Sequence, residues 1–201
     1  MVIIVLHGCQ CPQIVFSMEQ QRLELAVSWY VLRVTYQREM IAKRRLDELS
    51  IESFVPTKIV RVTLQNGRRA LQRRALVHNY IFVHSDRQTI DNIKRFELPY
   101  LRYVMHTVDS FYQPMVVPEC QMRSFMLVTG TEDERLRVVE PSSVELNAGT
   151  RVRVKGGPFA GAEGLLAKVP GARERRVVVR IEGIAAVATP RIARDLLEII
   201  E

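Results

Sequence analysis

Apolar and polar residues alternate along several stretches of the chain, as they do in β-strands with one buried face. Residues 80–83, Tyr-Ile-Phe-Val, form a nearly unbroken apolar run that is typical of a central strand. Strands are predicted in the first part of the chain over residues 29–35, 58–64, 69–74, 80–83 and 101–105. Gln65-Asn66-Gly67-Arg68 joins the second strand to the third, and Asn-Gly favours a hairpin turn with two positive φ angles.

Apolar residues at helical spacing predict three helices between or after these strands. The expected helices are residues 38–49, 87–96 and 119–128. The second helix would turn Ile90, Ile93 and Phe96 inward, and Pro118 stands where a proline favours the start of the third. The order β-α-β-β-β-α-β-α predicts an α/β sandwich, with helices packed on a mostly antiparallel sheet.

The pattern changes after residue 128. Residues 129–147 contain Gly130, an acidic run and Pro-Ser-Ser, which together predict a linker. Short strands follow over residues 150–155, 164–168, 175–181, 184–188 and 196–200. Five short strands in so short a segment indicate a small β-barrel. The fold class is therefore α+β, with a sandwich over residues 28–128, a linker over 129–147 and a barrel over 148–201.

Residues 1–27 are expected to be a flexible extension, and translation could begin at Met1 or at Met18. Leu6-His7-Gly8-Cys9 faintly resembles a lipoprotein processing box. The apolar run before it is too short for a signal peptide, however, and no Lys or Arg precedes it. No apolar run approaches the roughly 18 residues that span a membrane. A cytoplasmic protein without a membrane partner is the expectation.

Net charge changes this picture by pointing to an anionic partner. The 201 residues carry a formal net charge of +7, and 25% of them are charged. Lys and Arg exceed Asp and Glu in residues 28–127 and in residues 145–201, while residues 128–144 are acidic. The three cysteines form no disulfide framework and no zinc pattern, so neither a metal nor a cofactor is expected.

Residues 151–164 carry the most specific motif, Arg-Val-Arg-Val-Lys-Gly-Gly-Pro-Phe-Ala-Gly-Ala-Glu-Gly. It begins as a basic strand and breaks into turns, to which Gly157, Gly161 and Gly164 are assigned. A phosphate-binding loop is excluded, because Ala162-Glu163 stands where such a loop has Lys-Ser/Thr. The four histidines have no patterned carboxylate or cysteine companions, so an enzyme is not expected.

Several fragments, in order and at matching spacing, resemble the NusG family of transcription elongation factors. Trp29-Tyr30-Val31, Glu39, Phe54-Val55-Pro56 and Tyr80-Ile81-Phe82-Val83 resemble its N-terminal domain. Val116-Val117-Pro118-Glu119 resembles the entry to that domain's last helix. Residues 150–176 resemble the family's KOW motif, with its Gly-Pro-Phe-x-Gly core at 157–161. The resemblance covers residues 28–201.

Two further fragments resemble a specialised paralogue. Val77-His78-Asn79-Tyr80 stands where the housekeeping factor usually has Phe-Pro-Gly-Tyr. Residues 181–188, Ile-Glu-Gly-Ile-Ala-Ala-Val-Ala, are similar to the KOW domain of UpxY-type antiterminators, which control capsular polysaccharide operons in Bacteroidetes.

The resemblance implies three sets of contact residues in a monomeric protein. An apolar face that docks on the clamp helices of RNA polymerase would contain Tyr36, Phe54, Pro56, Tyr80 and Phe82. Contacts to non-template DNA, to the upstream DNA duplex or to nascent RNA would come from Lys43, Arg44, Arg68, Arg69, Arg73 and Arg74. The KOW domain would recruit a ribosomal protein or Rho through Arg151, Arg153, Phe159, Arg176 and Arg180. The resemblance also places a contact with the opposite rim of the polymerase cleft at Asp86-Arg87-Gln88-Thr89.

Simpler interpretations remain open for these residues. The aromatic side chains could be core, because Tyr80 and Phe82 share one strand face while Ile81 and Val83 share the other. The arginines could be a solvated basic face. The alternative function is a ribosome- or RNA-binding module that uses the barrel directly.

Overall fold

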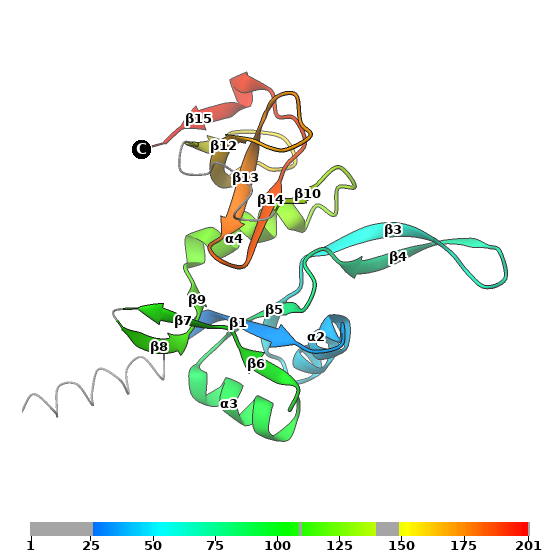
Figure 1. The fold of residues 1–201 in the computed structure, drawn as a ribbon, viewed down its shortest axis with the longest axis vertical. Helices are drawn as coiled ribbons and strands as arrows, with labels where there is room; N and C mark the ends of the chain where they lie inside the picture. The colour runs from blue at the N-terminus through cyan, green and yellow to red at the C-terminus, as the bar shows by residue number, and fades with distance from the viewer. Residues whose placement is uncertain (1–25, 109, 140–148, 201) are drawn as a thin grey trace, which may run out of the picture.

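The computed structural model describes residues 26–108, 110–139 and 149–200, and they form an α+β protein with antiparallel sheets (Figure 1). Strand β1 (Ser28–Val34) lies in the middle of the N-terminal sheet, whose strand order is β2-β5-β1-β6. Strand β1 pairs with β5 (Tyr80–Ser85), β6 (Leu101–Tyr103) and β9 (Val116–Val117), and β2 (Glu52–Phe54) pairs with the other edge of β5. The apolar run at 80–83 thus forms an inner strand, as predicted.

Helices cover both faces of this sheet. On one face Leu32 and Ile81 pack with residues of α2 (Glu39–Glu48) and α3 (Arg87–Phe96). On the other face Val31 and Phe82 pack with residues of α4 (Glu119–Thr129). Both pairs of alternating side chains on β5 therefore contribute to core packing.

The prediction that Phe96 faces inward was wrong. Phe96 is 71% exposed, whereas Leu98 is 3% exposed. Helix α3 ends at this point, and the amide nitrogens of Glu97 and Leu98 both donate to the carbonyl oxygen of Ile93, at 2.9 and 2.8 Å. The chain turns back there. Leu98 therefore packs in the core, and Phe96 is left exposed at the end of the helix.

Strands β3 (Thr57–Thr63) and β4 (Arg69–Ala75) form a separate two-stranded hairpin, which we call the arm. Figure 1 shows it projecting from the body of the molecule. Leu64 N donates to Arg68 O at 2.8 Å and Gly67 N donates to Leu64 O at 2.9 Å, so the loop has three residues. Gly67, with φ of 76°, is the one residue of this loop with a positive φ. The expected pair of positive φ angles was wrong, because a three-residue loop needs a left-handed residue only at its end.

Two features of the N-terminal part were not predicted. Strand β2 has only three residues, and β7 (Met105–Val108) pairs with β8 (Phe111–Pro114) in a second small hairpin. This hairpin has no apolar–polar alternation that predicts it, because its residues are exposed or half-buried on both faces.

The C-terminal part is a six-stranded antiparallel sheet in the order β10-β14-β13-β12-β11-β15. Its strands are β10 (Arg137–Val139), β11 (Thr150–Val154), β12 (Glu163–Lys168), β13 (Arg175–Ile181), β14 (Ala185–Ala188) and β15 (Leu197–Ile199). The five predicted strands are present, and β10 adds a sixth from the segment expected to be a linker. Among the described residues no pairing joins β10 to β15, so hydrogen bonds do not close this sheet into a barrel.

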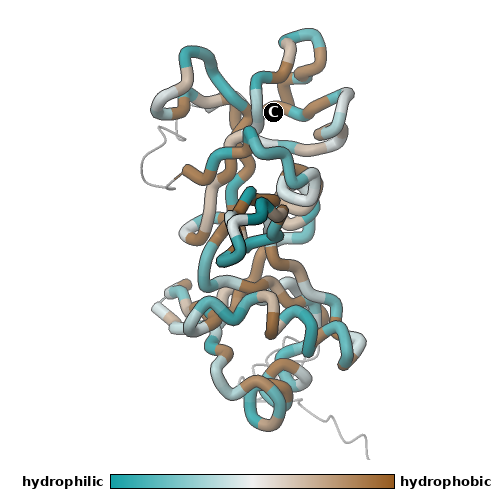
Figure 2. The backbone as a smooth tube through the Cα atoms, turned by 90° about the vertical axis from the view of Figure 1, so that its right-hand side faces the viewer, coloured by the Kyte–Doolittle hydropathy of each residue, from teal (hydrophilic) through white to brown (hydrophobic). Residues whose placement is uncertain are grey.

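Helix α4 connects the two parts through packing. One continuous apolar cluster runs from Val31 and Phe82 in the N-terminal sheet, through Phe125 on α4, to Val177 and Val179 on β13. Ser124 Oγ on α4 accepts a hydrogen bond from the Glu163 amide of β12 at 3.1 Å. Figure 2 shows brown, hydrophobic segments through the middle of the molecule, between its two ends. The two parts therefore share a core centred on α4.

Candidate functional site

Three of the predicted aromatic contact residues lie on one face of the N-terminal sheet. Phe54 is directly opposite Phe82 in the β2–β5 pair, and Tyr80 precedes Phe82 by two residues. Phe82 is 0% exposed, and its ring meets Phe125 edge-on with 5.7 Å between the ring centroids. Phe54 and Tyr80 are half-buried at the edge of the same cluster. Phe82 is thus a core residue in this structure, while Phe54 and Tyr80 retain accessible surface.

The other two predicted polymerase-contact residues lie apart from this pair. Pro56 is buried, and its carbonyl oxygen accepts a hydrogen bond from Leu76 N at 2.7 Å. Tyr36 is 83% exposed in a left-handed turn with φ of 60°. The Arg38 guanidinium lies 5.5 Å from the centroid of the Tyr36 ring and 5.2 Å from that of Tyr100. Arg38 therefore stabilises the position of the exposed Tyr36 ring through a cation–π contact.

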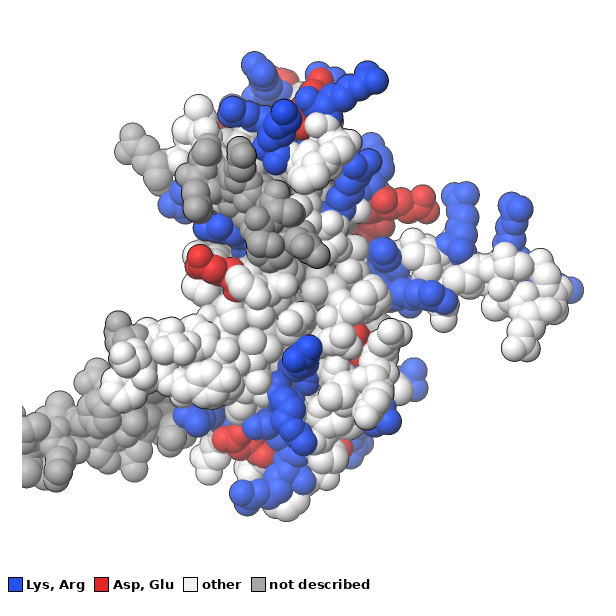
Figure 3. Space-filling model, viewed as in Figure 1, with Lys and Arg blue, Asp and Glu red and all other residues white. Residues whose placement is uncertain are grey.

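The arm carries most of the predicted nucleic-acid contacts. Arg68, Arg69, Arg73 and Arg74 are all exposed on it. The register adds two cations that the sequence analysis did not single out, Lys58 opposite Arg74 and Arg61 opposite Leu71. Both lie in the strand predicted over residues 58–64, whose pairing with residues 69–74 across the predicted hairpin could have revealed them. Figure 3 shows blue Lys and Arg side chains standing out from the arm.

The predicted contacts on α2 do not join the arm. Lys43 pairs with Asp47 one turn along the helix, whereas Arg44 is exposed. Because α2 packs on the other face of the sheet from α4, the structure separates Lys43 and Arg44 from the aromatic pair Phe54–Tyr80.

Glu132 fixes the base of the arm. Thr57 Oγ1 donates to Glu132 Oε1 at 2.7 Å, and Arg73 Nε lies 2.7 Å from the same oxygen. The Thr57 hydrogen bond and then Arg73 lower the pKa of the Glu132 carboxyl, against the opposing effect of partial burial. Glu132 itself adopts a φ of 50°, in a turn where it follows α4. This carboxylate thus links the arm to the segment between α4 and β10.

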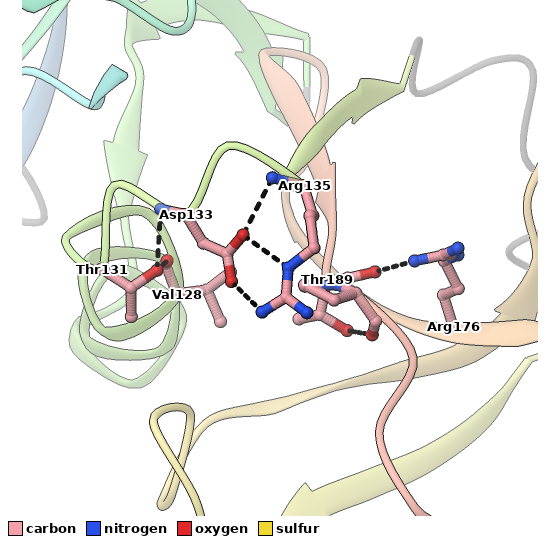
Figure 4. Close-up of polar contacts among 7 residues, drawn as sticks. Val128, Thr131, Asp133, Arg135, Arg176 and Thr189 are labelled. Carbon is pink, nitrogen blue, oxygen red and sulfur yellow. Dashed lines mark hydrogen bonds and ion pairs between the residues drawn. The ribbon is translucent and has the colours of Figure 1, made fainter. Parts of the chain in front are cut away.

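Neighbouring polar contacts order that segment (Figure 4). Thr131 Oγ1 donates to Val128 O at 2.8 Å. Asp133 accepts from the Arg135 side chain at 3.0 and 2.7 Å and from its amide at 2.8 Å. The first part of the predicted linker, up to β10, is therefore a hydrogen-bonded connection.

The predicted partner contacts on the C-terminal sheet fall into three groups. Phe159 is 4% exposed and belongs to the shared core. Arg153 is engaged by Glu163 at 2.7 Å, and Arg176 Nη1 donates to Thr189 O at 3.1 Å (Figure 4). Arg151 and Arg180 line a hollow of about 340 Å³ between α4 and this sheet. Only these last two arginines of the set are without a protein partner in the structure as described.

The rim-contact segment has a clear structural role. Asp86 is the N-cap of α3, and it accepts from Thr89 N at 2.8 Å and from Thr89 Oγ1 at 2.6 Å. The Thr89 hydroxyl lowers the pKa of the Asp86 carboxyl. The hydrogen bonds of Asp86 and Thr89 are therefore made within the N-cap of α3, and Arg87 and Gln88 remain exposed beside them.

A polar cluster that the sequence did not reveal closes one end of the N-terminal sheet. Trp29 Nε1 donates to Glu119 Oε2 at 2.9 Å, and the Trp29 ring stacks on His84 at 4.8 Å. His84 Nδ1 lies 2.7 Å from Glu52 Oε2. Within the ranges that the structure describes, no group of three or more His, Cys, Asp and Glu side chains could hold a metal ion. No helix in those ranges is long and apolar enough to cross a membrane.

The N-terminal part of the chain is similar to a known protein family. Residues 27–126 match the family model NusG, described as transcription termination factor nusG. No curated protein matches the chain. The matched residues run from β1 into α4, and the C-terminal sheet lies outside them.

The matched family consists of transcription factors. Its members are transcription elongation or termination factors rather than enzymes, and they typically bind RNA polymerase.

Proposed function

We propose that this protein is a transcription elongation and antitermination factor that binds the clamp helices of RNA polymerase through its N-terminal domain. The NusG match over residues 27–126 carries this proposal. The half-buried pair Phe54 and Tyr80 supports it, because aromatic side chains bury a large area at low entropic cost when they anchor an interface. Exposed Tyr36 would extend the contact.

The proposed mechanism requires no bond chemistry. A domain that bridges the clamp and the opposite rim of the cleft binds the closed polymerase better than the open one. It therefore shifts the population towards the closed, elongating state and suppresses pausing and termination. Arg87 and Gln88, exposed at the start of α3, would make the rim contact.

The C-terminal sheet would recruit a further factor. We propose that it is an SH3-like KOW domain, and its short antiparallel strands β11 to β15 and the Gly-Pro-Phe-x-Gly core at 157–161 support this. A ribosomal protein or Rho would bind at Arg151 and Arg180, which line the hollow beside α4. The fragments at 77–80 and 181–188 support a UpxY-type factor that acts on surface polysaccharide operons in the cytoplasm.

The experiment compares the two classes of partner directly. The immobilised full chain is offered purified RNA polymerase and purified ribosomes separately, at equal concentrations. Retention of polymerase supports the proposal. Retention of ribosomes without polymerase overturns it in favour of a ribosome- or RNA-binding module. Retention of neither also overturns it.

A further inference from the structure

The arm is a cationic ribbon with solvent on both faces. Its two strands pair with each other and with no other strand of the described chain. No Asp or Glu occurs between Glu52 and Asp86, so the arm carries no negative charge of its own. Glu132 neutralises only the base, at Arg73. Figure 3 shows blue Lys and Arg atoms and no red atoms on the outer part of the arm.

The cations divide evenly between the two faces. Side chains directly opposite each other in an antiparallel pair share a face, and neighbours along a strand alternate. The observed register therefore places Arg61, Arg69 and Arg73 on one face and Lys58, Arg68 and Arg74 on the other. The hydrogen bond from Arg74 Nε to Gln72 Oε1, at 3.1 Å, agrees with this assignment, because residues two apart share a face.

Cations on both faces indicate the shape of the ligand. A single strand, or a flat anionic surface, would contact one face and leave the other in solvent. A groove has two charged walls, and the major groove of B-form DNA, about 12 Å wide, admits a two-stranded β-ribbon. The major groove of an RNA duplex is deep and narrow, so side chains on a ribbon do not reach into it.

The length of the arm sets its orientation. Seven residues at about 3.4 Å each make a strand of roughly 24 Å, which is longer than the groove is deep, about 8.5 Å. The cations are spread from Lys58 at the base to Arg68 at the tip. The arm can bring all of these cations to the phosphates only if it lies along the groove.

We propose that the arm lies in the major groove of duplex DNA and contacts phosphates of both strands, one strand from each face. This rests on the proposed function and adds to it a nucleic-acid contact at the arm, with duplex DNA as the ligand. Phosphate contacts fix position and carry no sequence information, so the binding is independent of sequence.

The test measures the affinity of the full chain for three labelled ligands at several salt concentrations, by fluorescence anisotropy. The ligands are a 20-base-pair mixed-sequence DNA duplex, one of its single strands, and the matching RNA duplex. We expect the DNA duplex to bind at least tenfold more tightly than the other two. Equal binding to single strand and duplex, preference for the RNA duplex, or binding to none of them would overturn the proposal.

Paired variants test the use of both faces. Arg61→Gln/Arg69→Gln removes two cations from one face, and Arg68→Gln/Arg74→Gln removes two from the other. Each lost phosphate contact reduces the magnitude of the negative slope of log K against log salt by about 0.9. Each pair of substitutions should therefore reduce that magnitude by roughly two. An effect from only one pair would assign the contact to one face and overturn the groove geometry.

Arg95→Gln/Arg173→Gln is the matched control, because it removes two exposed cations outside the arm. We expect its salt slope to equal that of the wild type, and a fall as large as in the arm variants would show diffuse attraction instead of a site. Unchanged circular dichroism and Tm verify that each variant folds. Polymerase retention is measured separately, so loss of duplex binding with polymerase binding intact rejects the arm proposal alone.

Discussion

At the scale of single residues, Glu132 shows how one carboxylate positions an element. It receives the Thr57 hydroxyl and the Arg73 guanidinium, and its side chain is 18% exposed in the ion pair. The sequence placed Glu132 in an acidic linker run, and nothing in the local pattern indicated its partners. These lie 75 and 59 residues away, so only the tertiary fold brings them together.

Replacement of the carboxylate should make stability less dependent on pH. The pKa of Glu132 is lowered from its ordinary value of 4.5, so its contribution is full above about pH 4.5 and is lost as pH falls through the lowered pKa. We expect Glu132→Gln to reduce the free energy of unfolding by about 1 kcal/mol at pH 7, and by progressively less below pH 4.5. Urea denaturation between pH 7 and pH 3 measures this.

Glu134→Gln is the control, because Glu134 is a nearby exposed carboxylate. It should change stability by less than about 0.5 kcal/mol. A loss for Glu132→Gln that stays constant down to pH 3 would contradict the assigned role of the charge.

At the scale of elements, strongly periodic segments were predictable and weakly patterned ones were not. The bounds predicted for α3 coincide with those observed, because Ile90 and Ile93 mark a buried stripe and Asp86 caps the start. Strands β2, β7 and β8 were missed, since they are short or exposed on both faces. Phe54 and Phe82 were predicted at one site, and the sheet register does bring them together. Burial of Phe82 depends on α4, whose packing the sequence of β5 cannot show.

Gly164 was assigned both to the glycine-rich turn and to the start of a strand, and the structure places it within strand β12. A Cβ at this position would lie 2.7 Å from the carbonyl oxygen of Val178. At Gly156 a Cβ would meet only the end of the Leu196 side chain, at 3.3 Å. Gly157 and Gly161, with φ of 81° and 87°, do lie in turns. The glycine at 164 is therefore required by close strand packing.

The glycine pair gives a stability test of the C-terminal sheet. Gly164→Ala should lower the free energy of unfolding by about 1–3 kcal/mol, because backbone must move to admit the methyl group. Gly156→Ala should cost less than 1 kcal/mol, since a flexible side-chain end can shift. Equal losses in urea denaturation would refute the packing at Val178.

In the molecule as a whole, α4 joins the two parts because its side chains pack in the core of each. Met122 and Phe125 pack on the N-terminal sheet, and Ser124 contacts β12. The sequence predicted two domains with a linker between them. The sequence did not reveal that the two domains pack together. The apolar spacing in α4 predicts a helix, but it does not show that the helix contacts the C-terminal sheet as well as the N-terminal one. The candidate aromatic pair therefore lies on the sheet face that also supports the C-terminal part.

A bulky charge at the contact should separate the parts without unfolding either. Ser124 is 6% exposed, so Ser124→Arg places a guanidinium where β12 packs on α4. We expect small-angle X-ray scattering to report a larger radius of gyration, with the circular dichroism spectrum unchanged. Ser124→Ala removes the acceptor of the Glu163 amide without adding volume, and it should leave the radius as in the wild type. An unchanged radius for Ser124→Arg would contradict the shared core.

We propose that the N-terminal domain docks on RNA polymerase through the face that holds Phe54 and Tyr80. The most direct test is the Kd of the full chain for purified RNA polymerase, measured for the wild type, Tyr80→Ala and Tyr112→Ala. Tyr112 is the matched control, a 73% exposed tyrosine on β8 outside the proposed face. We predict that Tyr80→Ala weakens binding at least tenfold, about 1.4 kcal/mol, while Tyr112→Ala binds as the wild type does. Equal affinity of Tyr80→Ala and the wild type would contradict docking through this face, and no binding by the wild type would contradict docking on polymerase.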